Sequence, residues 1–480
     1  MKPLINILKG INVISVYGNN NIMIKGLSID SRLVQDNFLF FAVDGNNFDG
    51  HEYINSSIKK GCVAVVATKK PKDLHNDICY IIIDNIREAV YRISSNFFEN
   101  PSKKIKIISV TGTNGKTSIV YFLYNFLKSI GKNVGMFSTI ENKIGDKSIK
   151  SKLTTPDPIY INEILNDMVN KKFDYCIMEA SSHAIDQKRV DGSDVYIAIF
   201  SNISHDHLDY HKTFKNYIDT KKMLFDNLNE KSYSIVNSDD KRSNYIIQNT
   251  RSKVYTYGLN TISDYKGKII ENNINGLLLD INNKKVNLKI IGDYNASNIL
   301  AVYSVGKILK LDDNLILRQI SSLKTPKGRF DYVEGGNNTV GIVDYAHTPD
   351  ALKNILSSIN NFKNNKKIIT VFGAGGDRDK SKRHEMGKIA DEFSDFIYLT
   401  SDNPRNEDEM EIINDIMDGV NSKNYSIILN RKDAISKACS DFNSDSIILI
   451  AGKGHEQFQI IKDKILPHDD MDILKNELNL

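Results

Sequence analysis

Two kinds of hydrophobic pattern alternate along most of the chain. Short continuous apolar runs, such as IKIISV (105–110), are typical of parallel strands that are buried on both faces. Other apolar positions, such as Val120, Phe122, Leu123 and Phe126, repeat at the spacing of a helix. This alternation of strand and helix predicts an α/β fold with doubly wound parallel sheets.

The chain divides into three blocks, which we assign to residues 1–102, 103–325 and 326–480. The first block ends near ENPSKK (99–104), a polar stretch with a proline that is typical of a linker. Its short apolar runs predict a small mixed α/β domain. We expect strands at 39–43, 63–67 and 80–83, and helices at 53–60 and 86–98.

The second and third blocks each repeat the alternation of strand and helix. The second predicts a central domain with a doubly wound parallel sheet. Within it, residues 253–291 alternate in short pieces with N-G and N-N turns, which predicts a small appended antiparallel sheet before a helix over 296–309. The third block predicts a Rossmann-like α/β domain.

Composition argues against several classes of protein. Of the 480 residues, 41% are hydrophobic and 25% are charged, and the net charge of +4 is too weak and dispersed to indicate nucleic-acid binding or a membrane surface. Four scattered cysteines form no C-x-x-C pair, so we expect buried free thiols. Since the sequence shows neither a signal segment nor a membrane-spanning stretch, we expect a cytoplasmic protein, and we expect a monomer.

The segment VTGTNGKTS (110–118) lies between an apolar strand and an apolar-striped helix. Its glycines, lysine and hydroxyl are those of a phosphate-binding loop, although the G-x-x-x-x-G-K-[ST] spacing would require glycine in place of Val110. A tight strand-to-helix turn is the alternative. Because backbone N–H groups at a helix amino terminus bind anions, strand, loop and helix together favour a phosphate site. Lys116 would reach the β- and γ-phosphates, and Thr117 would bind Mg²⁺.

Two further polar clusters follow predicted strands. MEASSH (178–183) places Glu179, Ser181 and His183 just past one strand, and SNISHDHLDYH (201–211) follows the next. Each cluster taken singly favours a capping or surface role. Ligands in open α/β sheets gather outside the carboxyl ends of the strands, however, so three such segments predict one shared metal–nucleotide site.

These segments resemble the motifs of the Mur ligase family, ATP-dependent amide-forming enzymes of peptidoglycan synthesis. The resemblance covers essentially the whole chain, and it implies a uridine-nucleotide domain, a P-loop-type ATP-binding domain and a C-terminal domain that binds the incoming amino acid. Its motifs are SIDSR (28–32), FAVDGNNFDGHEYI (41–54), GTNGKT (112–117), the segments 179–183 and 202–211, GDYNASN (292–298), DYAHTPD (344–350), FGAGGDRDKSKR (372–383), SDNPR (401–405) and AGKGHE (451–456).

The resemblance also implies a reaction and its cofactors. ATP phosphorylates a substrate carboxylate and an amine then attacks the acyl phosphate, so cationic groups must neutralise two anions that meet. The motifs at both ends are similar to the branch that adds meso-diaminopimelate to UDP-N-acetylmuramoyl-L-alanyl-D-glutamate. ATP and Mg²⁺ are the implied cofactors, and these small-molecule substrates are the expected partners.

Matching positions carry the site residues of the family over to this chain. The implied ATP site comprises Thr111, Gly112, Thr113, Asn114, Gly115, Lys116, Thr117, Asn295, Asn298, Arg329 and Asp344. The implied magnesium ligands or close neighbours are Thr117, Glu179, His207 and Lys221, and the implied catalytic residues are Lys116, Lys221 and His207. The implied contacts of the nucleotide-peptide substrate are Ile29, Ser31, Asn46, Asn47, Phe48, Thr154, Thr155, Ser181, Gln187 and Arg189.

Lys221, in NYIDTKKMLF (216–225), allows two interpretations. Because Lys222 is its neighbour, the pattern alone favours a solvated helix face. The resemblance instead implies that Lys221, rather than Lys222, reacts with carbon dioxide to form a carbamate. A carbamate is an anionic oxygen ligand suited to a second Mg²⁺.

The segment SDNPR bears on which amino acid is added. Asn-Pro alone favours a strand-end turn with a surface arginine, whereas the resemblance implies that Arg405 pairs with the second carboxylate of diaminopimelate. The alternatives are L-lysine or another diamino acid in the same reaction, a folylpolyglutamate synthase, and a catalytically inactive nucleotide-binding regulator. The implied amino-acid site comprises Arg378, Asp402, Asn403, Pro404, Arg405, Gly452 and Glu456.

Two positions depart from the family pattern. His205 precedes Asp206, at a position where the family has arginine. Histidine in place of arginine would weaken a charge contact there. Lys327 lies before the glycine–arginine pair, where the family tends to have a shorter, apolar approach. Neither change removes an essential chemical group.

Overall fold

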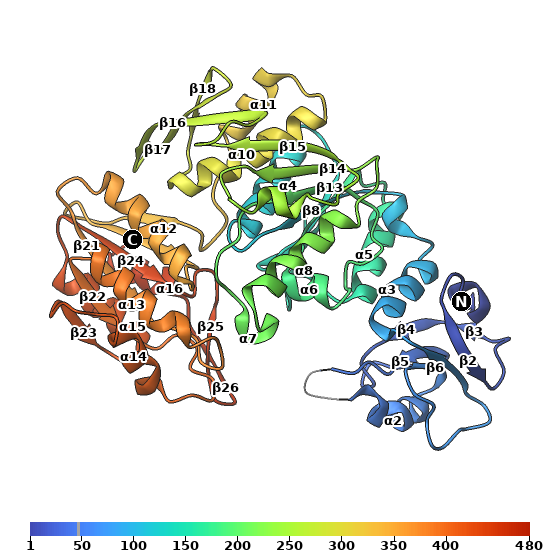
Figure 1. The fold of residues 1–480 in the computed structure, drawn as a ribbon. Helices are drawn as coiled ribbons and strands as arrows, with labels where there is room; N and C mark the ends of the chain where they lie inside the picture. The colour runs from blue at the N-terminus through green and yellow to red at the C-terminus, as the bar shows by residue number, and fades with distance from the viewer. Residues whose placement is uncertain (46–48) are drawn as a thin grey trace.

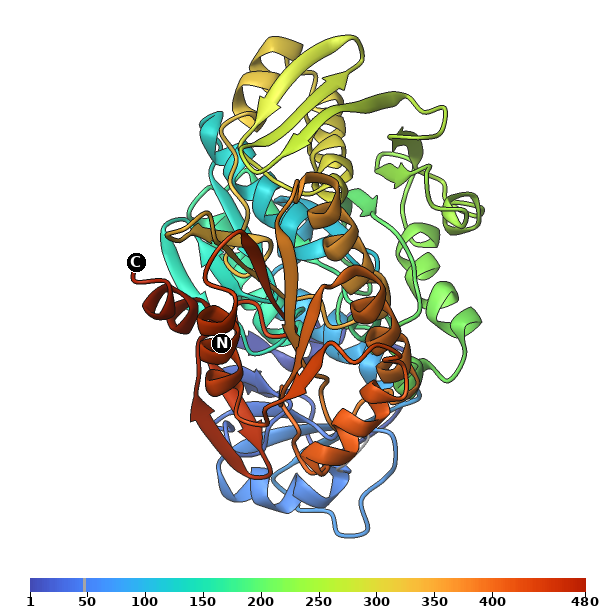
Figure 2. The ribbon, with the colours of Figure 1, turned by 90° about the vertical axis from the view of Figure 1, so that its left-hand side faces the viewer.

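The structure is a computed structural model that describes residues 1–45 and 49–480. Three main sheets lie in three successive domains (Figure 1). Turning the molecule by 90° brings the C-terminal domain in front of the central one (Figure 2). The predicted three-domain α/β architecture is therefore confirmed.

The first domain is built on a mixed sheet with strand order β2-β7-β6-β5-β4. Strands β4 to β7 run parallel, and β2 pairs antiparallel with β7. The expected elements are present with ends shifted by no more than two residues. The elements are β1 (Lys2–Pro3), α1 (Leu4–Ile7), β2 (Val13–Tyr17), β3 (Met23–Ile24), β4 (Gly26–Ser28), β5 (Phe38–Phe41), α2 (Ile54–Lys59), β6 (Cys62–Ala67), β7 (Cys79–Ile83) and α3 (Ile86–Phe97).

The central domain contains an eleven-stranded sheet with order β11-β10-β9-β12-β8-β13-β14-β15-β16-β17-β18, whose middle from β9 to β16 is parallel. Its elements outside the hairpins described next are β8 (Lys106–Thr111), α4 (Lys116–Ser129), β9 (Val134–Phe137), α5 (Pro158–Asn170), β12 (Tyr175–Glu179), α6 (Ser182–Asp186), β13 (Val195–Phe200), α7 (Leu208–His211), α8 (Phe214–Asp226), β14 (Tyr233–Asn237), α9 (Ser243–Ile246), β15 (Lys253–Gly258), α10 (Asp293–Ile308) and α11 (Asp313–Ile320).

Helices cover both faces of this sheet, which explains the continuous apolar strands. Ile108 and Val110 of β8 belong to a core that contains residues of α4 and α10. Ile107 belongs to the core on the other face of the sheet, which contains residues of α5 and α8. Val110 is therefore a buried strand residue, and the phosphate-loop candidate begins after it.

Antiparallel hairpins extend the central sheet at both edges. β16 (Tyr265–Asn273), β17 (Gly276–Ile281) and β18 (Lys284–Leu288) form the predicted antiparallel piece. β15, which we expected in that piece, instead pairs parallel with β14 and β16. The hairpin of β10 (Glu141–Ile144) and β11 (Lys147–Lys150) was missed, because its mostly polar and charged strands carry no clear hydrophobic alternation.

The third domain has a six-stranded sheet with order β19-β20-β24-β21-β22-β23, parallel except at β19. This confirms the Rossmann-like prediction. Its elements are β19 (Asp331–Glu334), β20 (Val340–Asp344), α12 (Pro349–Phe362), β21 (Lys367–Phe372), α13 (Ser381–Phe393), β22 (Phe396–Leu399), α14 (Glu409–Met417), β23 (Tyr425–Ile427), α15 (Arg431–Asp441), β24 (Ser446–Ala451), β25 (Phe458–Ile461), β26 (Lys464–Pro467) and α16 (Asp470–Glu477).

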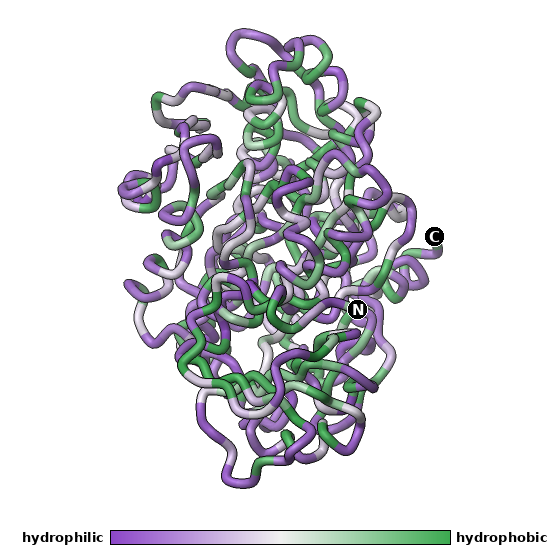
Figure 3. The backbone as a smooth tube through the Cα atoms, turned by 90° about the vertical axis from the view of Figure 1, so that its right-hand side faces the viewer, coloured by the Kyte–Doolittle hydropathy of each residue, from purple (hydrophilic) through white to green (hydrophobic). Residues whose placement is uncertain are grey.

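Hydrophobic segments lie mainly along the inner strands and helices, and hydrophilic segments form most of the outer loops (Figure 3). Each of the four cysteines is buried and free, as predicted. Within residues 1–45 and 49–480, no helix is both long and apolar enough to cross a membrane.

Candidate active site at the domain junction

The loop between β8 and α4 depends on two glycines. Gly112 and Gly115 have φ angles of 149° and 86°, which residues with a side chain rarely adopt. A Cβ atom at Gly112 would lie 2.0 Å from Ser201 Oγ, and one at Gly115 would lie 2.6 Å from Asn298 Oδ1. The loop thus turns tightly into the amino terminus of α4, where N–H groups and the helix dipole favour an anion.

Asn202, just after β13, holds this loop in place. Its backbone oxygen accepts a hydrogen bond from the Thr113 N–H at 2.8 Å, and its side-chain oxygen accepts one from the Asn114 N–H at 3.0 Å. The segment at 201–211 therefore lies against the loop, as the shared strand-end position predicts.

Two lysines converge on the carbonyl of Gly112. Lys116 Nζ donates to this oxygen at 2.9 Å and to the Thr113 oxygen at 2.7 Å. Lys221 Nζ, from α8, donates to the same Gly112 oxygen at 2.8 Å. Burial lowers the pKa of Lys116, and burial together with the nearby Lys116 charge lowers the pKa of Lys221 far below its ordinary value.

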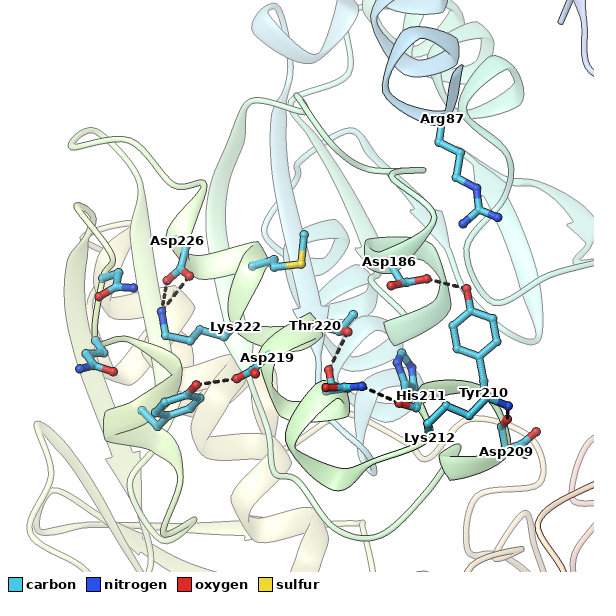
Figure 4. A pocket seen from close by; sticks show the side chains of 15 residues that line it. Arg87, Asp186, Asp209, Tyr210, His211, Lys212, Asp219, Thr220, Lys222 and Asp226 are labelled. Carbon is cyan, nitrogen blue, oxygen red and sulfur yellow. Dashed lines mark hydrogen bonds and ion pairs between the residues drawn. The ribbon is translucent and has the colours of Figure 1, made fainter. Parts of the chain in front are cut away.

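Lys221 and Lys222 project to different places. Lys221 is 1% exposed and lines the same pocket as the phosphate loop. Lys222 points into a separate pocket, where its ammonium pairs with Asp226 at 2.6 Å (Figure 4). Both side chains are buried, so the interpretation of a solvated helix face is wrong for this pair.

Glu179 is a fully buried carboxylate at the end of β12. Its two oxygens accept from the Thr139 N–H at 2.7 Å and the Thr139 hydroxyl at 3.1 Å. Thr155 donates its hydroxyl to the Glu179 backbone oxygen at 2.6 Å. The carboxylate is held by hydroxyl and amide donors rather than by a neighbouring cation, which leaves its charge available to a ligand.

His207 is the N-cap residue of α7 and has a φ of 55°. Its ring approaches that of His183, with 4.8 Å between centroids, and its Nε2 atom lies 3.3 Å from Asp206 Oδ2. Burial lowers the pKa of His207 to about 3, so the ring is neutral near pH 7 and one nitrogen can accept a proton or bind a metal.

The third domain contributes Arg329 to the central site. Its Nη2 atom donates to Thr117 Oγ1 at 3.3 Å, and its guanidinium lies 4.4 Å from the centroid of Tyr345. Asp344 lies behind it, where the Phe330 N–H donates to its carboxylate at 2.7 Å. Burial raises the pKa of Asp344 to about 6, against the opposing effect of Arg329.

Asn295 and Asn298 lie side by side on α10. Asn298 Nδ2 donates to Asn295 Oδ1 at 3.0 Å, and Asn295 Nδ2 donates to the Ile291 oxygen at 2.8 Å. Since Asn298 also borders Gly115, this pair lies directly behind the phosphate loop rather than in the pocket itself.

A pocket of about 360 Å³ collects most of the predicted residues. It lies between the central and third domains, and Asn114 Nδ2 donates to Asp350 Oδ2 across the junction at 2.8 Å. The predicted site residues that line it are Thr113, Asn114, Gly115, Lys116, Thr117, Thr154, Thr155, Glu179, Ser181, Arg189, His207, Lys221, Arg329 and Arg378.

The predicted substrate residues fall into two groups. Arg189 donates to the Thr155 backbone oxygen at 2.9 Å and to Gln187 Oε1 at 3.0 Å, so Gln187 supports the pocket from behind. Ile29 and Ser31 lie on the first domain, just after β4, and do not line this pocket. Asn46, Asn47 and Phe48 fall outside the described residues.

The predicted amino-acid residues form a neighbouring group in the third domain. Arg405 Nη1 donates to the Gly376 oxygen at 2.7 Å, and Gly375 lies between Arg378 and Arg405. Burial lowers the pKa of Arg405, and the charge of Arg378 lowers it further.

The rest of this group meets at the ends of β22 and β24. Asn403 Nδ2 donates to Glu456 Oε2 at 2.9 Å. A Cβ atom at Gly452 would lie 2.6 Å from Asp402 Oδ2, and one at Gly376 would lie 1.9 Å from the Pro404 oxygen.

Sequence reasoning missed several residues at the site. Thr139 donates to Glu179 and follows β9, but no motif marks this strand end in the sequence. Tyr345 and His347 line the pocket from DYAHTPD, the segment that had already been singled out. Asp350 belongs to that segment too, but only the fold shows that it meets Asn114.

The two departures from the family pattern both lie beside a carboxylate of the third domain. His205 Nε2 lies 3.4 Å from Asp379 Oδ2 of the third domain. Lys327 Nζ lies 3.2 Å from Asp469 Oδ2. Each side chain can therefore interact with a carboxylate of the third domain.

Three family models match the chain in the order of its domains. The model described as "Mur ligase family, catalytic domain" matches residues 23–108. The "Mur ligase middle domain" matches residues 110–306, and the "Mur ligase, glutamate ligase domain" matches residues 328–454.

Curated relatives and a solved structure match over almost the full length. A UDP-N-acetylmuramoyl-L-alanyl-D-glutamate–2,6-diaminopimelate ligase from Cytophaga hutchinsonii is 45% identical, with 98% of this chain and 97% of the relative covered. One of the same name from Bacteroides thetaiotaomicron is 44% identical, covering 98% and 99%. A solved structure with this ligase name has a TM-score of 0.70 at 26% identity, covering 100% and 99% of the two chains.

Proposed function

The chain belongs to the Mur ligase family, and on this basis we propose that it is an ATP-dependent ligase that joins meso-diaminopimelate to UDP-N-acetylmuramoyl-L-alanyl-D-glutamate. The observation that carries the proposal is the single pocket in which Lys116 of the phosphate loop meets Glu179, Lys221 and the third-domain residue Arg329. This pocket combines a phosphate-binding loop, a buried carboxylate and cations from two domains, which are the groups that phosphoryl transfer to a carboxylate requires.

The chain's own residues would act on the phosphates directly. The loop N–H groups would hold the phosphate chain, and Lys116 would exchange its bonds to backbone oxygens for bonds to the transferred phosphoryl group. Arg329 would bring a second positive charge, that of its guanidinium, from the third domain, because it already reaches Thr117. The substrate carboxylate would become an acyl phosphate, and the amine would attack it with release of phosphate.

The oxygen donors of the pocket fit magnesium. The Thr117 hydroxyl and the Glu179 carboxylate are both buried and line one cavity, and the neutral His207 ring adds a nitrogen donor beside them. Hydroxyl and carboxylate oxygens are the ligands that Mg²⁺ takes. When bound, the ion would offset charge on the transferred phosphoryl group.

We also propose the carbamate on Lys221. Burial lowers the pKa of the Lys221 amine and so favours its neutral form, which can attack carbon dioxide, forming an N–C bond and releasing a proton. The product would place an anion beside Lys116, where two amines now share one carbonyl oxygen. Its position within the pocket, unlike that of Lys222, supports this assignment.

The amino acid would bind in the third domain. Arg405 and Arg378 would pair with the second carboxylate of diaminopimelate, and Glu456 would face an ammonium group. The nucleotide end of the other substrate would bind on the first domain near Ile29 and Ser31, with its peptide directed to Thr155 and Arg189. We also propose that the protein is a monomer that acts in the cytoplasm.

A coupled assay of ADP release tests the proposal. Release should require Mg²⁺, the UDP-linked dipeptide and the amino acid together, and one amide should form for each ADP. A protein that hydrolyses ATP without either substrate, or that binds ATP without turnover, would be better described as a nucleotide-binding regulator.

A further inference from the structure

Lys453 is a buried cation that the proposed reaction does not yet use. It follows β24 in the segment AGKGHE, and its side chain is fully buried. A lysine that is removed from water needs partners of complementary charge. Its partners therefore indicate what its charge does.

The Lys453 ammonium contacts two residues of the proposed amino-acid site. Nζ donates to Asn403 Oδ1 at 3.0 Å and to Glu456 Oε2 at 2.9 Å. Asn403 Nδ2 donates to that same Glu456 oxygen at 2.9 Å, which closes a triangle of three side chains. Oε2 of Glu456 thus accepts two hydrogen bonds within the protein.

The backbone on both sides of Lys453 is constrained. Gly452 and Gly454 have φ angles of 113° and 53°. A Cβ atom at Gly452 would lie 2.6 Å from Asp402 Oδ2, and one at Gly454 would lie 2.6 Å from the Gly328 oxygen. The loop is fixed between Asp402 and the third-domain segment that carries Arg329, so Lys453 has little freedom to turn away.

We propose that Lys453 is a positioning residue that sets amino-acid specificity by neutralising Glu456, and this inference rests on the proposed function of the site. With that carboxylate offset by Lys453, the charges of Arg378 and Arg405 are set against those of Asp402 and Asp377. The far end of diaminopimelate carries both a carboxylate and an ammonium, whereas the far end of lysine carries an ammonium alone. Lys453 therefore keeps this group from carrying an excess of negative charge, which would favour the lone ammonium of lysine over the carboxylate and ammonium of diaminopimelate.

Charge and hydrogen bonding can be separated by two substitutions. Lys453→Gln keeps a donor toward Asn403 and Glu456 but removes the charge, and Lys453→Arg keeps the charge with altered geometry. We expect Lys453→Gln to lower the ratio of kcat/KM for diaminopimelate over lysine by roughly tenfold or more. Lys453→Arg should retain most of the ratio, and the KM for ATP should change less than about twofold in both variants.

Lys437→Gln provides the matched control. Lys437 is a half-exposed lysine of the same domain that pairs with Asp441 on α15. Its loss should leave unchanged the ratio of kcat/KM for diaminopimelate over lysine, as well as the KM values for ATP and diaminopimelate. If Lys453→Gln and Lys453→Arg lower activity equally toward both amino acids, the role of Lys453 is structural and the inference is wrong.

A complementary variant covers the case in which Lys453→Gln does not fold. Glu456→Gln would leave the Lys453 charge unbalanced, so discrimination against lysine should rise even as overall activity falls. An unchanged or lower discrimination would contradict the inference. If the wild type forms no amide with diaminopimelate, the proposed function itself fails, whereas a diaminopimelate-selective wild type with an unaltered Lys453→Gln ratio refutes only the inference.

Discussion

Lys116 and Lys221 donate to one and the same carbonyl oxygen, that of Gly112, at 2.9 and 2.8 Å. Two amines so close repel each other when both are charged, and each has a lowered pKa. The arrangement is stabilised when one amine stays neutral or when an anion arrives. A bound phosphate and a carbamate would each supply such an anion.

Replacing Lys116 by alanine should abolish ligase activity. No other side chain of the loop carries a cation to the transferred phosphoryl group, so we expect a loss of about 10³-fold or more in kcat. Lys128→Ala, on the exposed face of the same helix, is the control and should keep near-normal turnover. A folded Lys116→Ala protein with near-normal kcat would refute the phosphate-loop assignment.

Lys221 and Lys222 form a matched pair for testing the carbamate. Lys221→Ala should lose most activity, bicarbonate should not restore it, and acetate should restore part of it by supplying carboxylate oxygens. Lys222→Ala removes the pair with Asp226 and the contact with the Tyr245 ring, both outside the pocket of the phosphate loop, and should retain catalysis. Mass spectrometry and ¹³C NMR of active protein in labelled bicarbonate should detect the adduct, and a free Lys221 amine in active enzyme would exclude it.

Breaking the fully buried Arg431–Asp470 pair should strongly destabilise the third domain. Arg431 donates to both carboxylate oxygens, at 2.8 and 2.7 Å. Asp470→Ala leaves this guanidinium buried without its carboxylate, so the free energy of unfolding in urea should fall by about 3–5 kcal/mol. Asp167→Ala breaks an exposed pair with Lys171 and should cost less than about 1 kcal/mol.

This pair also predicts a pH dependence. Despite burial, which favours the neutral acid, Arg431 holds the pKa of Asp470 below its ordinary value. The pair's contribution is therefore present above the unfolded pKa of about 3.9 and is lost as the pH falls below that value. The wild-type advantage over Asp470→Asn should shrink in acid, and an advantage that grows there would contradict the assignment.

Arg405 should decide between diaminopimelate and lysine. Arg405→Ala removes the guanidinium that we propose pairs with the second carboxylate, so kcat/KM for diaminopimelate should fall by roughly 10²-fold while that for lysine changes little. Arg318→Ala, on α11 of the central domain, serves as the control. An unchanged preference in Arg405→Ala would contradict this role for the arginine.

Local patterns were sufficient to predict the three α/β domains because their strands are continuous apolar runs. Val110 illustrates this, since its burial in β8 explains why the loop lacks the first glycine of the usual spacing. The hairpin of β10 and β11 was missed because Lys147 to Lys150 are exposed or half-buried and carry no apolar alternation. Hydrophobic periodicity reports burial, and this hairpin buries little.

The sequence predicted which residues of each segment belong to the site, but it did not predict how the two domains meet there. The strand-end rule brings Glu179 and Asn202 to the phosphate loop, but it does not place the third domain. The contacts of Arg329 with Thr117 and of Asn114 with Asp350 join residues 212 and 236 positions apart. Such contacts depend on how two domains meet, which no local pattern encodes.

A competition experiment tests the central claim most directly. The protein is supplied with ATP, Mg²⁺, the UDP-linked dipeptide and equal amounts of meso-diaminopimelate, lysine and ornithine, and the nucleotide products are resolved by mass spectrometry. We predict that the diaminopimelate tripeptide predominates and that its amount equals the amount of ADP released. Predominance of the lysine or ornithine product would contradict the specificity, and ADP release without any tripeptide would contradict the ligase assignment itself.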